Sequence, residues 1–292
     1  MPKIGLLFPG QGSQSIGMGK ELYHQLPSAK RLMDIANDIL GFDIKSIVFA
    51  GSPDKLSLTE IAQPAIYIVS AMYMEKFKEL REPFEIVAGH SLGEYSALYA
   101  AGVLSFEDGL QLVRKRGLAM SNTNAMGSMY AVIGLTLEEV EPYLEKYEQK
   151  VVVANINTKN QIVISGYVKE AAQAAEELAE LDNVQVKQLK VSSAFHSPLM
   201  SEAQTIMAEE IDKVNFMVPK CFITPNISAI PTKDVQIIRE SLKKQITGKV
   251  NWVDTILGMK TLGIERLYEI GHGDILRKMN KGITLRPKCI GI

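Results

Sequence analysis

The sequence predicts a mixed α/β fold, in which a large domain built on a mostly parallel sheet carries a small inserted domain. Three observations predict it. Short apolar segments alternate with segments of helical period through residues 4–121 and again through 199–270, as in a parallel sheet covered by helices. Between these parts, the order changes to strand, helix, strand, strand, helix, strand. A Gly-x-Ser-x-Gly segment at 89–93 lies between a predicted strand and a predicted helix.

The first part of the chain supplies two strands and five helices of the large domain. Residues 4–8 form an apolar run that Pro9-Gly10 ends, so they predict a buried strand entering a loop. A second strand is expected at 85–88. Helices are expected at 17–26, 29–40, 61–80, 92–101 and 105–121. Gly41 is typical of a helix end, and Ser105 of a helix start.

Residues 127–191 predict the inserted domain. Its strands are expected at 129–133, 151–155, 161–165 and 184–189, and its helices at 136–147 and 169–181. This order is that of a ferredoxin-like unit. Thr136 and Glu139 have the spacing of a capping box at the first of these helices. The segment "INTKN" is expected to join the two middle strands as a loop.

The chain then returns to the large domain, which we expect to comprise residues 1–126 and 192–292. Helices at 199–214, 235–246 and 252–262, and strands at 222–225 and 266–270, complete it.

Composition indicates an ordinary globular protein. Of 292 residues, 46% are hydrophobic and 22% charged, and the formal net charge of −1 favours binding to neither nucleic acid nor membrane surfaces. No segment approaches the about 20 apolar residues that span a bilayer. Cys221 and Cys289 belong to no Cys-x-x-Cys pair or Cys/His cluster, so we expect neither a disulfide nor a metal site. We expect a cytoplasmic monomer.

The segment Gly89-His90-Ser91-Leu92-Gly93 predicts a sharp strand–turn–helix junction of the kind that presents a nucleophilic serine in α/β-hydrolase-like domains. Ser91 would lie at a helix N-terminus, where free N–H groups favour negative charge. The N–H of Leu92 would point to where an oxyanion forms. The plainer alternative is a buried turn serine without a chemical role.

A serine hydroxyl needs a base to attack at neutral pH, and the chain has four histidines. His24 lies on an amphipathic surface helix, and His90 adjoins the serine, where neighbouring side chains point apart. His272 fits the Ser–acid–His chain order of α/β-hydrolases, with Asp254 or another carboxylate as the third member. His196 follows the last strand of the inserted domain and would lie at a cleft between domains. The residues alone leave His196 and His272 open.

Motifs along nearly the whole chain resemble those of the malonyl-CoA:acyl-carrier-protein transacylase family, of the fatty acid synthesis type or the free-standing, trans-acting polyketide synthase type. The segments that carry the resemblance are "FPGQGSQSIGMG", "TEIAQPAIY", "AGHSLGEYSALYAAG", "LVRKRGLAM", "NQIVISG", "SSAFHSPLM", "LKKQITGKVNW" and "LYEIGHG". Several ordered motifs at family spacing are far more specific than any one of them.

The resemblance implies a role for each matching residue. Ser91 would be the nucleophile and His196 its base, with the main-chain carbonyl of Gln245 orienting the imidazole in place of an aspartate. Backbone N–H groups of Gln11 and Leu92 would form the oxyanion hole.

The resemblance also implies how the substrate is selected. Arg116 would bind the malonyl carboxylate and Gln63 would support it, although Arg116 on the sequence alone is more simply a surface arginine beside Arg114 and Lys115. Phe195 implies unbranched malonyl, because its bulk opposes an α-methyl group, a discrimination worth about 1–3 kcal/mol.

The implied reaction is ping-pong acyl transfer. Malonyl-CoA acylates the serine, and the phosphopantetheine thiol of an acyl carrier protein then takes the malonyl group. The chemistry needs no metal and no bound cofactor, but water must be kept from the ester.

The chain departs from the family at Gly271-His272-Gly273-Asp274, where housekeeping members carry a Gly-Pro-Gly-Lys-like segment. This departure favours a specialised pathway without deciding it. The basic residues Arg277, Lys278 and Lys281 could dock an acidic carrier protein, or form a solvated helix face.

Three alternatives remain open. An editing acyl-thioester hydrolase would have no need of a buried cation for uncharged acyl groups. A silent docking subunit would not need Ser91, His196, Gln11 and Arg116. An esterase would use His272 as its base.

Overall fold

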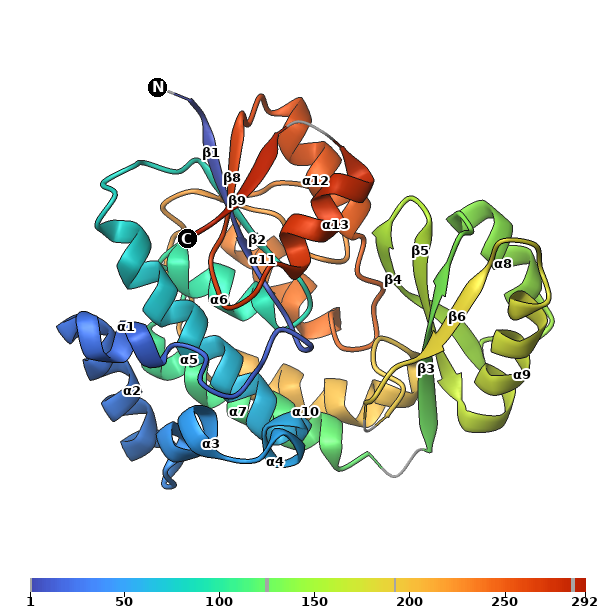
Figure 1. Ribbon diagram of the computed structural model, residues 1–292, viewed down its shortest axis with the longest axis horizontal. Coiled ribbons are helices and arrows are strands. Elements are labelled where there is room, and N and C mark those ends of the chain that lie inside the picture. Colours follow the sequence, from blue (N-terminus) through green and yellow to red (C-terminus); the bar gives the residue numbers. More distant parts are fainter. Residues whose placement is uncertain (1, 124–125, 192, 285–286) are drawn as a thin grey trace.

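Two sheets in separate halves of the molecule organise the fold (Figure 1). The computed structural model describes residues 2–123, 126–191, 193–284 and 287–292. Within these residues, the larger sheet has five parallel strands in the order β7-β2-β1-β8-β9, and the smaller has four antiparallel strands in the order β4-β5-β3-β6. The expected α/β class, with a mostly parallel sheet and a small second unit, is therefore confirmed.

The strands of the large sheet come from distant parts of the chain. They are β1 (Ile4–Phe8), β2 (Ile86–Gly89), β7 (Phe222–Ile223), β8 (Arg266–Glu269) and β9 (Lys288–Gly291). β1 is central and fully buried, because helices cover both faces of the sheet. Its side chains alternate: Leu6 and Phe8 belong to one core, and Leu7 to the core on the opposite face.

Most helices surround this sheet. They are α1 (Lys20–Gln25), α2 (Pro27–Leu40), α3 (Ile44–Ala50), α4 (Pro53–Ser57), α5 (Thr59–Lys78), α6 (Gly93–Ala100), α7 (Phe106–Ser121), α10 (Ser201–Asp212), α11 (Val235–Lys244), α12 (Trp252–Thr261) and α13 (Ile275–Ile283), with a 3₁₀ turn at Pro198–Met200. The sequence did not predict α3, α4, α13 or β9. The predicted caps at Gly41, with φ 71°, and at Ser105, whose side chain accepts from Asp108 N–H, are confirmed.

Helix α5 begins two residues earlier than expected, so Pro64 lies inside it and not in its first turn. Proline cannot donate to the carbonyl four residues before it, which is that of Glu60. Arg114 donates to this carbonyl instead, with its Nη1 atom 2.7 Å away.

The small unit has the predicted β-α-β-β-α-β order. It comprises β3 (Gly127–Ile133), α8 (Leu137–Glu145), β4 (Val151–Thr158), β5 (Gln161–Tyr167), α9 (Val168–Ala179) and β6 (Gln185–Gln188). The capping box of Thr136 and Glu139 is present. The expected loop "INTKN" is wrong in part, because β4 continues to Thr158 through bulged pairing with β5. The domain boundaries stay a prediction, and residue 192, where the large domain was expected to resume, lies outside the described residues.

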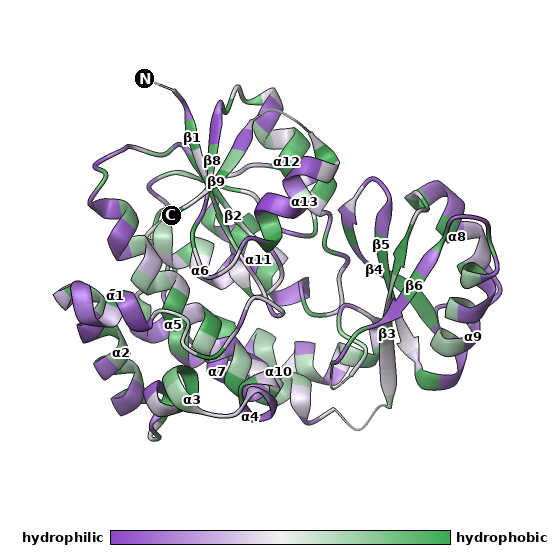
Figure 2. Cartoon of the chain, in the orientation of Figure 1, coloured by the Kyte–Doolittle hydropathy of each residue, from purple (hydrophilic) through white to green (hydrophobic). Residues whose placement is uncertain are grey.

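Helices α2 and α9 each have a polar side and an apolar side (Figure 2). The apolar side of α2 packs on the core of the large half, and that of α9 on the core of the small half. In the described part of the chain, every helix is too short or too polar to cross a lipid bilayer.

The two halves are joined by backbone hydrogen bonds as well as by the chain. The N–H of Ile156 in β4 donates to the carbonyl of Val250 at 3.0 Å, and the N–H of Val250 donates to Ala154 at 2.9 Å. These bonds hold the edge of the small sheet beside the segment that leads into α12 (Figure 1).

Candidate active site

Ser91 lies in a sharp turn between β2 and α6, with φ of 52°. The turn brings backbones so close that side chains would not fit at the two glycines. A Cβ on Gly89 would lie 1.8 Å from the carbonyl carbon of Gly93, and one on Gly93 would lie 2.1 Å from the carbonyl oxygen of Phe8. The two glycines of the motif are therefore required by space, as expected for a nucleophile elbow.

The hydroxyl of Ser91 faces His196, with 2.7 Å between Oγ and Nε2. The other ring nitrogen, Nδ1, lies 3.0 Å from the carbonyl oxygens of both Gln245 and Gly248. Carbonyls only accept hydrogen bonds, so Nδ1 carries the proton and Nε2 is free to accept the serine hydrogen. This arrangement would let Ser91 act as a nucleophile with His196 as its general base, and the two roles stay a prediction.

Burial keeps His196 in its neutral form. The imidazole is 3% exposed. Desolvation, and then the positive charge of Arg116, lower the pKa of His196 to about 3, while the carbonyls of Gln245 and Gly248 act in the opposite direction. A neutral imidazole at physiological pH is the form that accepts a proton.

Arg116 is not the surface arginine that its charged neighbours suggest. Its side chain, from α7, is buried at 1% exposure. Its Nη2 atom lies 3.1 Å from Ser91 Oγ and 3.0 Å from Gln245 Oε1, and its guanidinium lies 5.7 Å from the ring of Tyr95. Its Nε atom has no hydrogen-bond partner among the described residues. A buried guanidinium with donors to spare can bind an anionic group beside the serine.

Ser91, Arg116 and His196 line a cavity of about 500 Å³ between the two halves. The large half contributes Gln11, Ser91 and Arg116, and the small half contributes Asn157 from β4 and Val163 from β5. The position between two sheets is a common one for ligand sites.

The two expected oxyanion donors are available. The N–H groups of Gln11 and Leu92 donate no hydrogen bond to any residue that the structure describes. Gln11 lines the cavity with Ser91, and Leu92 follows Ser91 at the start of α6. Their roles stay a prediction.

Phe195 and Gln63, which the resemblance assigns to substrate selection, also line the cavity. Phe195 lines it beside His196. The side chain of Gln63 donates to the sulfur of Met120 at 3.5 Å, and its Oε1 atom has no partner in the described part of the chain. Its hydrogen bonding therefore gives no direct support to Arg116.

The structure does not bring His272 to Ser91. The Nε2 atom of His272 lies 2.7 Å from Ser15 Oγ instead. His90 turns away from the serine, as expected, and its Nε2 atom lies 2.8 Å from Asn157 Oδ1 across the cleft. His24 packs against Tyr23 on α1.

Glu94 and Asn226 belong to the site but were missed in the sequence. Glu94 is buried in the first turn of α6, where an acidic side chain among small and apolar residues was a usable signal. Asn226 accepts from the N–H of Ser91 at 2.7 Å and donates to the carbonyl of Gly89 at 2.6 Å. It therefore holds both sides of the turn.

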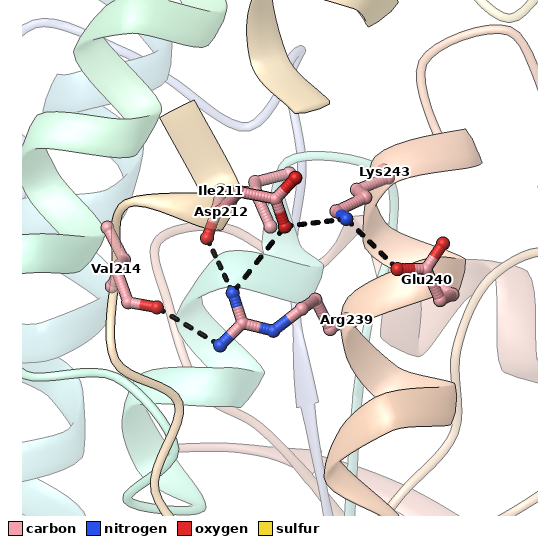
Figure 3. Close-up of polar contacts among 6 residues, drawn as sticks. All are labelled: Ile211, Asp212, Val214, Arg239, Glu240 and Lys243. Carbon is pink, nitrogen blue, oxygen red and sulfur yellow. Dashed lines mark hydrogen bonds and ion pairs between the residues drawn. The ribbon is translucent and has the colours of Figure 1, made fainter. Parts of the chain in front are cut away.

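Gln245 directly follows α11, so the site depends on where that helix lies. Arg239 of α11 donates to the carbonyls of Ile211 and Val214 at the end of α10, at 2.8 and 3.1 Å (Figure 3). Lys243 pairs with Asp212 at 2.6 Å. These contacts fix α11 against α10.

Over the described residues, no three His, Cys, Asp or Glu side chains are placed together to hold a metal ion.

Comparison with known proteins gives consistent matches over the whole chain. A family model described as acyl transferase domain matches residues 6–250. A malonyl CoA-acyl carrier protein transacylase of Bacillus subtilis (strain 168) is 40% identical over 297 residues, which cover 100% of this chain and 94% of the relative.

Two further matches extend this result. The polyketide biosynthesis malonyl CoA-acyl carrier protein transacylase PksC of the same organism is 40% identical, over 94% of each chain. The crystal structure of an acyl-carrier-protein-S-malonyltransferase from Bartonella henselae superposes with a TM-score of 0.95 at 38% identity, and covers 99% of this chain and 95% of that one.

Proposed function

The chain belongs to the acyl transferase domain family, and from this premise we propose that it moves a malonyl group from malonyl-CoA to the phosphopantetheine thiol of an acyl carrier protein. The observation that carries the proposal is the buried guanidinium of Arg116, 3.1 Å from Ser91 Oγ in a cavity that also contains His196. A carboxylate on the acyl group is the substrate feature that such a cation would select.

In the first half-reaction, His196 Nε2 takes the proton of Ser91 while Oγ attacks the thioester carbonyl. The N–H groups of Gln11 and Leu92 stabilise the oxyanion of the tetrahedral intermediate. The intermediate collapses by breaking the carbon–sulfur bond, and His196 returns the proton to the leaving CoA thiolate. A malonyl ester on Ser91 remains.

In the second half-reaction, His196 takes the proton of the phosphopantetheine thiol, and the sulfur attacks the ester carbonyl. Collapse of this intermediate breaks the bond to Ser91 Oγ, which recovers its proton from His196. The neutral state of His196, supported by its lowered pKa, suits it to accept the proton in both halves.

Arg116 binds the malonyl carboxylate in this scheme, and Phe195 at the cavity wall disfavours an α-branched acyl group. Gln63 lines the same cavity as Arg116, and its supporting role stays a prediction. Malonyl-CoA is a substrate, and no bound cofactor is required.

The acyl carrier protein is the proposed partner, supported by the names of the two Bacillus subtilis relatives. The product serves fatty acid or polyketide synthesis. The basic residues Arg277, Lys278 and Lys281 are the proposed docking residues for the carrier protein, although Arg277 and Lys278 also form exposed ion pairs with Asp274 at 3.4 and 2.8 Å. The monomeric state and the cytoplasmic location stay predictions, to be tested by light scattering and by cell fractionation.

The proposal is tested by mixing the protein with malonyl-CoA and measuring its intact mass. We expect a malonyl adduct that Ser91→Ala abolishes and that His196→Ala slows by several orders of magnitude. His272→Ala is the matched histidine control and should leave the rate unchanged. If His272→Ala abolished the adduct and His196→Ala did not, the esterase alternative would be favoured.

A second step adds a carrier protein that bears phosphopantetheine. We expect the malonyl group to appear on the carrier protein. Release of free malonate in its presence would instead favour the editing hydrolase.

A further inference from the structure

Glu94 lies beneath the reacting groups, three residues after Ser91 and in the first turn of α6. Its carboxylate is 1% exposed, and Oε2 accepts two hydrogen bonds. One comes from Gln245 Nε2 at 2.8 Å and the other from the N–H of Asn226 at 3.2 Å. The mechanism above gives this buried acid no role.

The Gln245 side chain connects Glu94 to Arg116. An amide has two hydrogens on nitrogen and one accepting oxygen, so its two ends are not interchangeable. Gln245 Nε2 donates to Glu94 Oε2 and to the carbonyl of Ser91, both at 2.8 Å. Gln245 Oε1 accepts from Arg116 Nη2 at 3.0 Å.

The carboxylate of Glu94 fixes this orientation of the amide together with the carbonyl of Ser91 and the guanidinium of Arg116. If the amide of Gln245 were turned over, its oxygen would face the carboxylate of Glu94 and the carbonyl of Ser91. Its NH₂ group would face the guanidinium of Arg116. All three contacts would then be repulsive, because acceptors would meet acceptors and donors would meet a donor.

The contact between Glu94 and Arg116 through the Gln245 amide also stabilises the buried charge of Arg116. A buried guanidinium is unstable without a nearby negative charge. A carboxylate paired directly with Arg116 would occupy the donors that an anionic substrate needs. In its ionised form, which predominates above its raised pKa of about 7, Glu94 supplies the charge from behind the Gln245 amide, and its attraction to Arg116 opposes the rise that burial causes in that pKa.

We propose that Glu94 is a positioning residue for acyl-group selection, which sets the orientation of the Gln245 amide and thereby holds Arg116 ready for a carboxylate on the acyl group. This inference rests on the proposed function, because it deepens the role of Arg116 in that reaction. It predicts that Glu94 affects malonyl and acetyl groups differently, although it touches neither.

The test compares malonyl-CoA with acetyl-CoA as acyl donors for Ser91, by rapid-quench measurement of kcat/KM for ester formation. In Glu94→Gln, which keeps the shape but removes the negative charge and one of the three contacts that orient the Gln245 amide, we expect the malonyl value to fall about 10- to 100-fold. The acetyl value should change by less than about threefold. Glu94→Asp, which keeps the charge, should retain most of the preference for malonyl.

A double-mutant cycle separates this role from a general structural one. In an Arg116→Ala background, Glu94→Gln should have no further effect on the malonyl rate, because its route of action is gone. Glu269→Gln is the matched control, since Glu269 is also a fully buried carboxylate but accepts from the N–H groups of Leu276 and Arg277. It should lower stability without changing the malonyl-to-acetyl ratio.

Equal losses for both donors in Glu94→Gln, or an effect that persists undiminished without Arg116, would overturn the inference. If Glu94→Gln does not fold, Gln245→Met removes the connecting amide and must give the same selective loss. A wild-type protein that forms no malonyl ester would defeat the proposed function itself, so the two failures are distinguishable.

Discussion

Ser91 and His196 both have a left-handed backbone conformation, with φ of 52° and 57°. Such angles are uncommon for residues other than glycine, and they persist only where surrounding contacts impose them. At Ser91, those contacts are the hydrogen bonds to Asn226 and from Gln245. At His196, the backbone N–H donates to the carbonyl of Ile246 at 3.1 Å. Both residues of the proposed nucleophile–base pair therefore have a strained backbone, as do five other described non-glycine residues.

Glu94 links stability to pH. Burial raises its pKa from 4.5 to about 7, so the folded protein binds the proton of this carboxyl more tightly than the unfolded chain does. The stability that this tighter binding contributes is fully present below pH 4.5 and is lost as pH rises through 7. Glu94→Gln has no charge to bury. We therefore expect the Tm of this variant, relative to the wild type, to rise between pH 5 and pH 8 by roughly 3–8 °C.

Calorimetry at several pH values measures this difference. Arg116 and Tyr95, which face the carboxylate, keep their charge states over this range, because burial raises the pKa of Tyr95 well above its usual value and an arginine stays charged. A Tm difference that does not vary with pH would contradict the prediction.

A site residue could be predicted from the sequence when the residues next to it in the chain indicate its role, and not when its role depends on contacts with distant segments. Ser91 was predictable from its own motif, because the two glycines and the strand–helix context are local. His196 was not, because its distance from Ser91 depends on the whole chain, and the residues left it equal to His272. Arg116 had an overlooked local signal: it shares one face of α7 with buried Leu112 and Met120.

At the scale of elements, helix α11 positions Gln245, which directly follows it. The position of α11 depends in turn on its contacts with α10. Arg239→Met removes two hydrogen bonds, one to the carbonyl of Ile211 in the last turn of α10 and one to that of Val214 just after the helix. We expect a loss of about 1–3 kcal/mol in the free energy of unfolding, measured in urea. Lys243→Met is the control, and should cost less because its ion pairs are at the surface.

If Arg239→Met left the unfolding midpoint unchanged, the position of α11 would not depend on this contact.

Local pattern predicted most elements of the fold, since long amphipathic helices and buried strands carry strong periodicity. It failed for α3, α4 and β9, which are four to seven residues long and too short to show a period, and also for α13, which is nine residues long.

At the scale of the molecule, the cavity lies between two halves that are joined at Val250. The N–H groups of Ile156 and Val250 should therefore exchange with deuterium at similar, slow rates, because both open only when the halves separate. We expect malonyl-CoA to slow both further, measured by exchange and mass spectrometry. Exchange at the rate of the exposed strand β6 would contradict this.

The pairing of Ala154, Ile156 and Val250 could not be predicted from the sequence. It joins segments almost one hundred residues apart and has no motif, because backbone groups and not side chains make it. For the same reason, the sequence predicted the two sheets but not how they meet.

The position of β1 in the large sheet has a consequence for biosynthesis. β1 lies between β2 and β8, so one of its edges remains unpaired until residues 266–269 have been made. The small antiparallel unit is contiguous, and can form on the ribosome much earlier. The nascent chain must therefore carry an apolar strand with an open edge through most of its synthesis, the interval in which a chaperone that covers such edges would matter most.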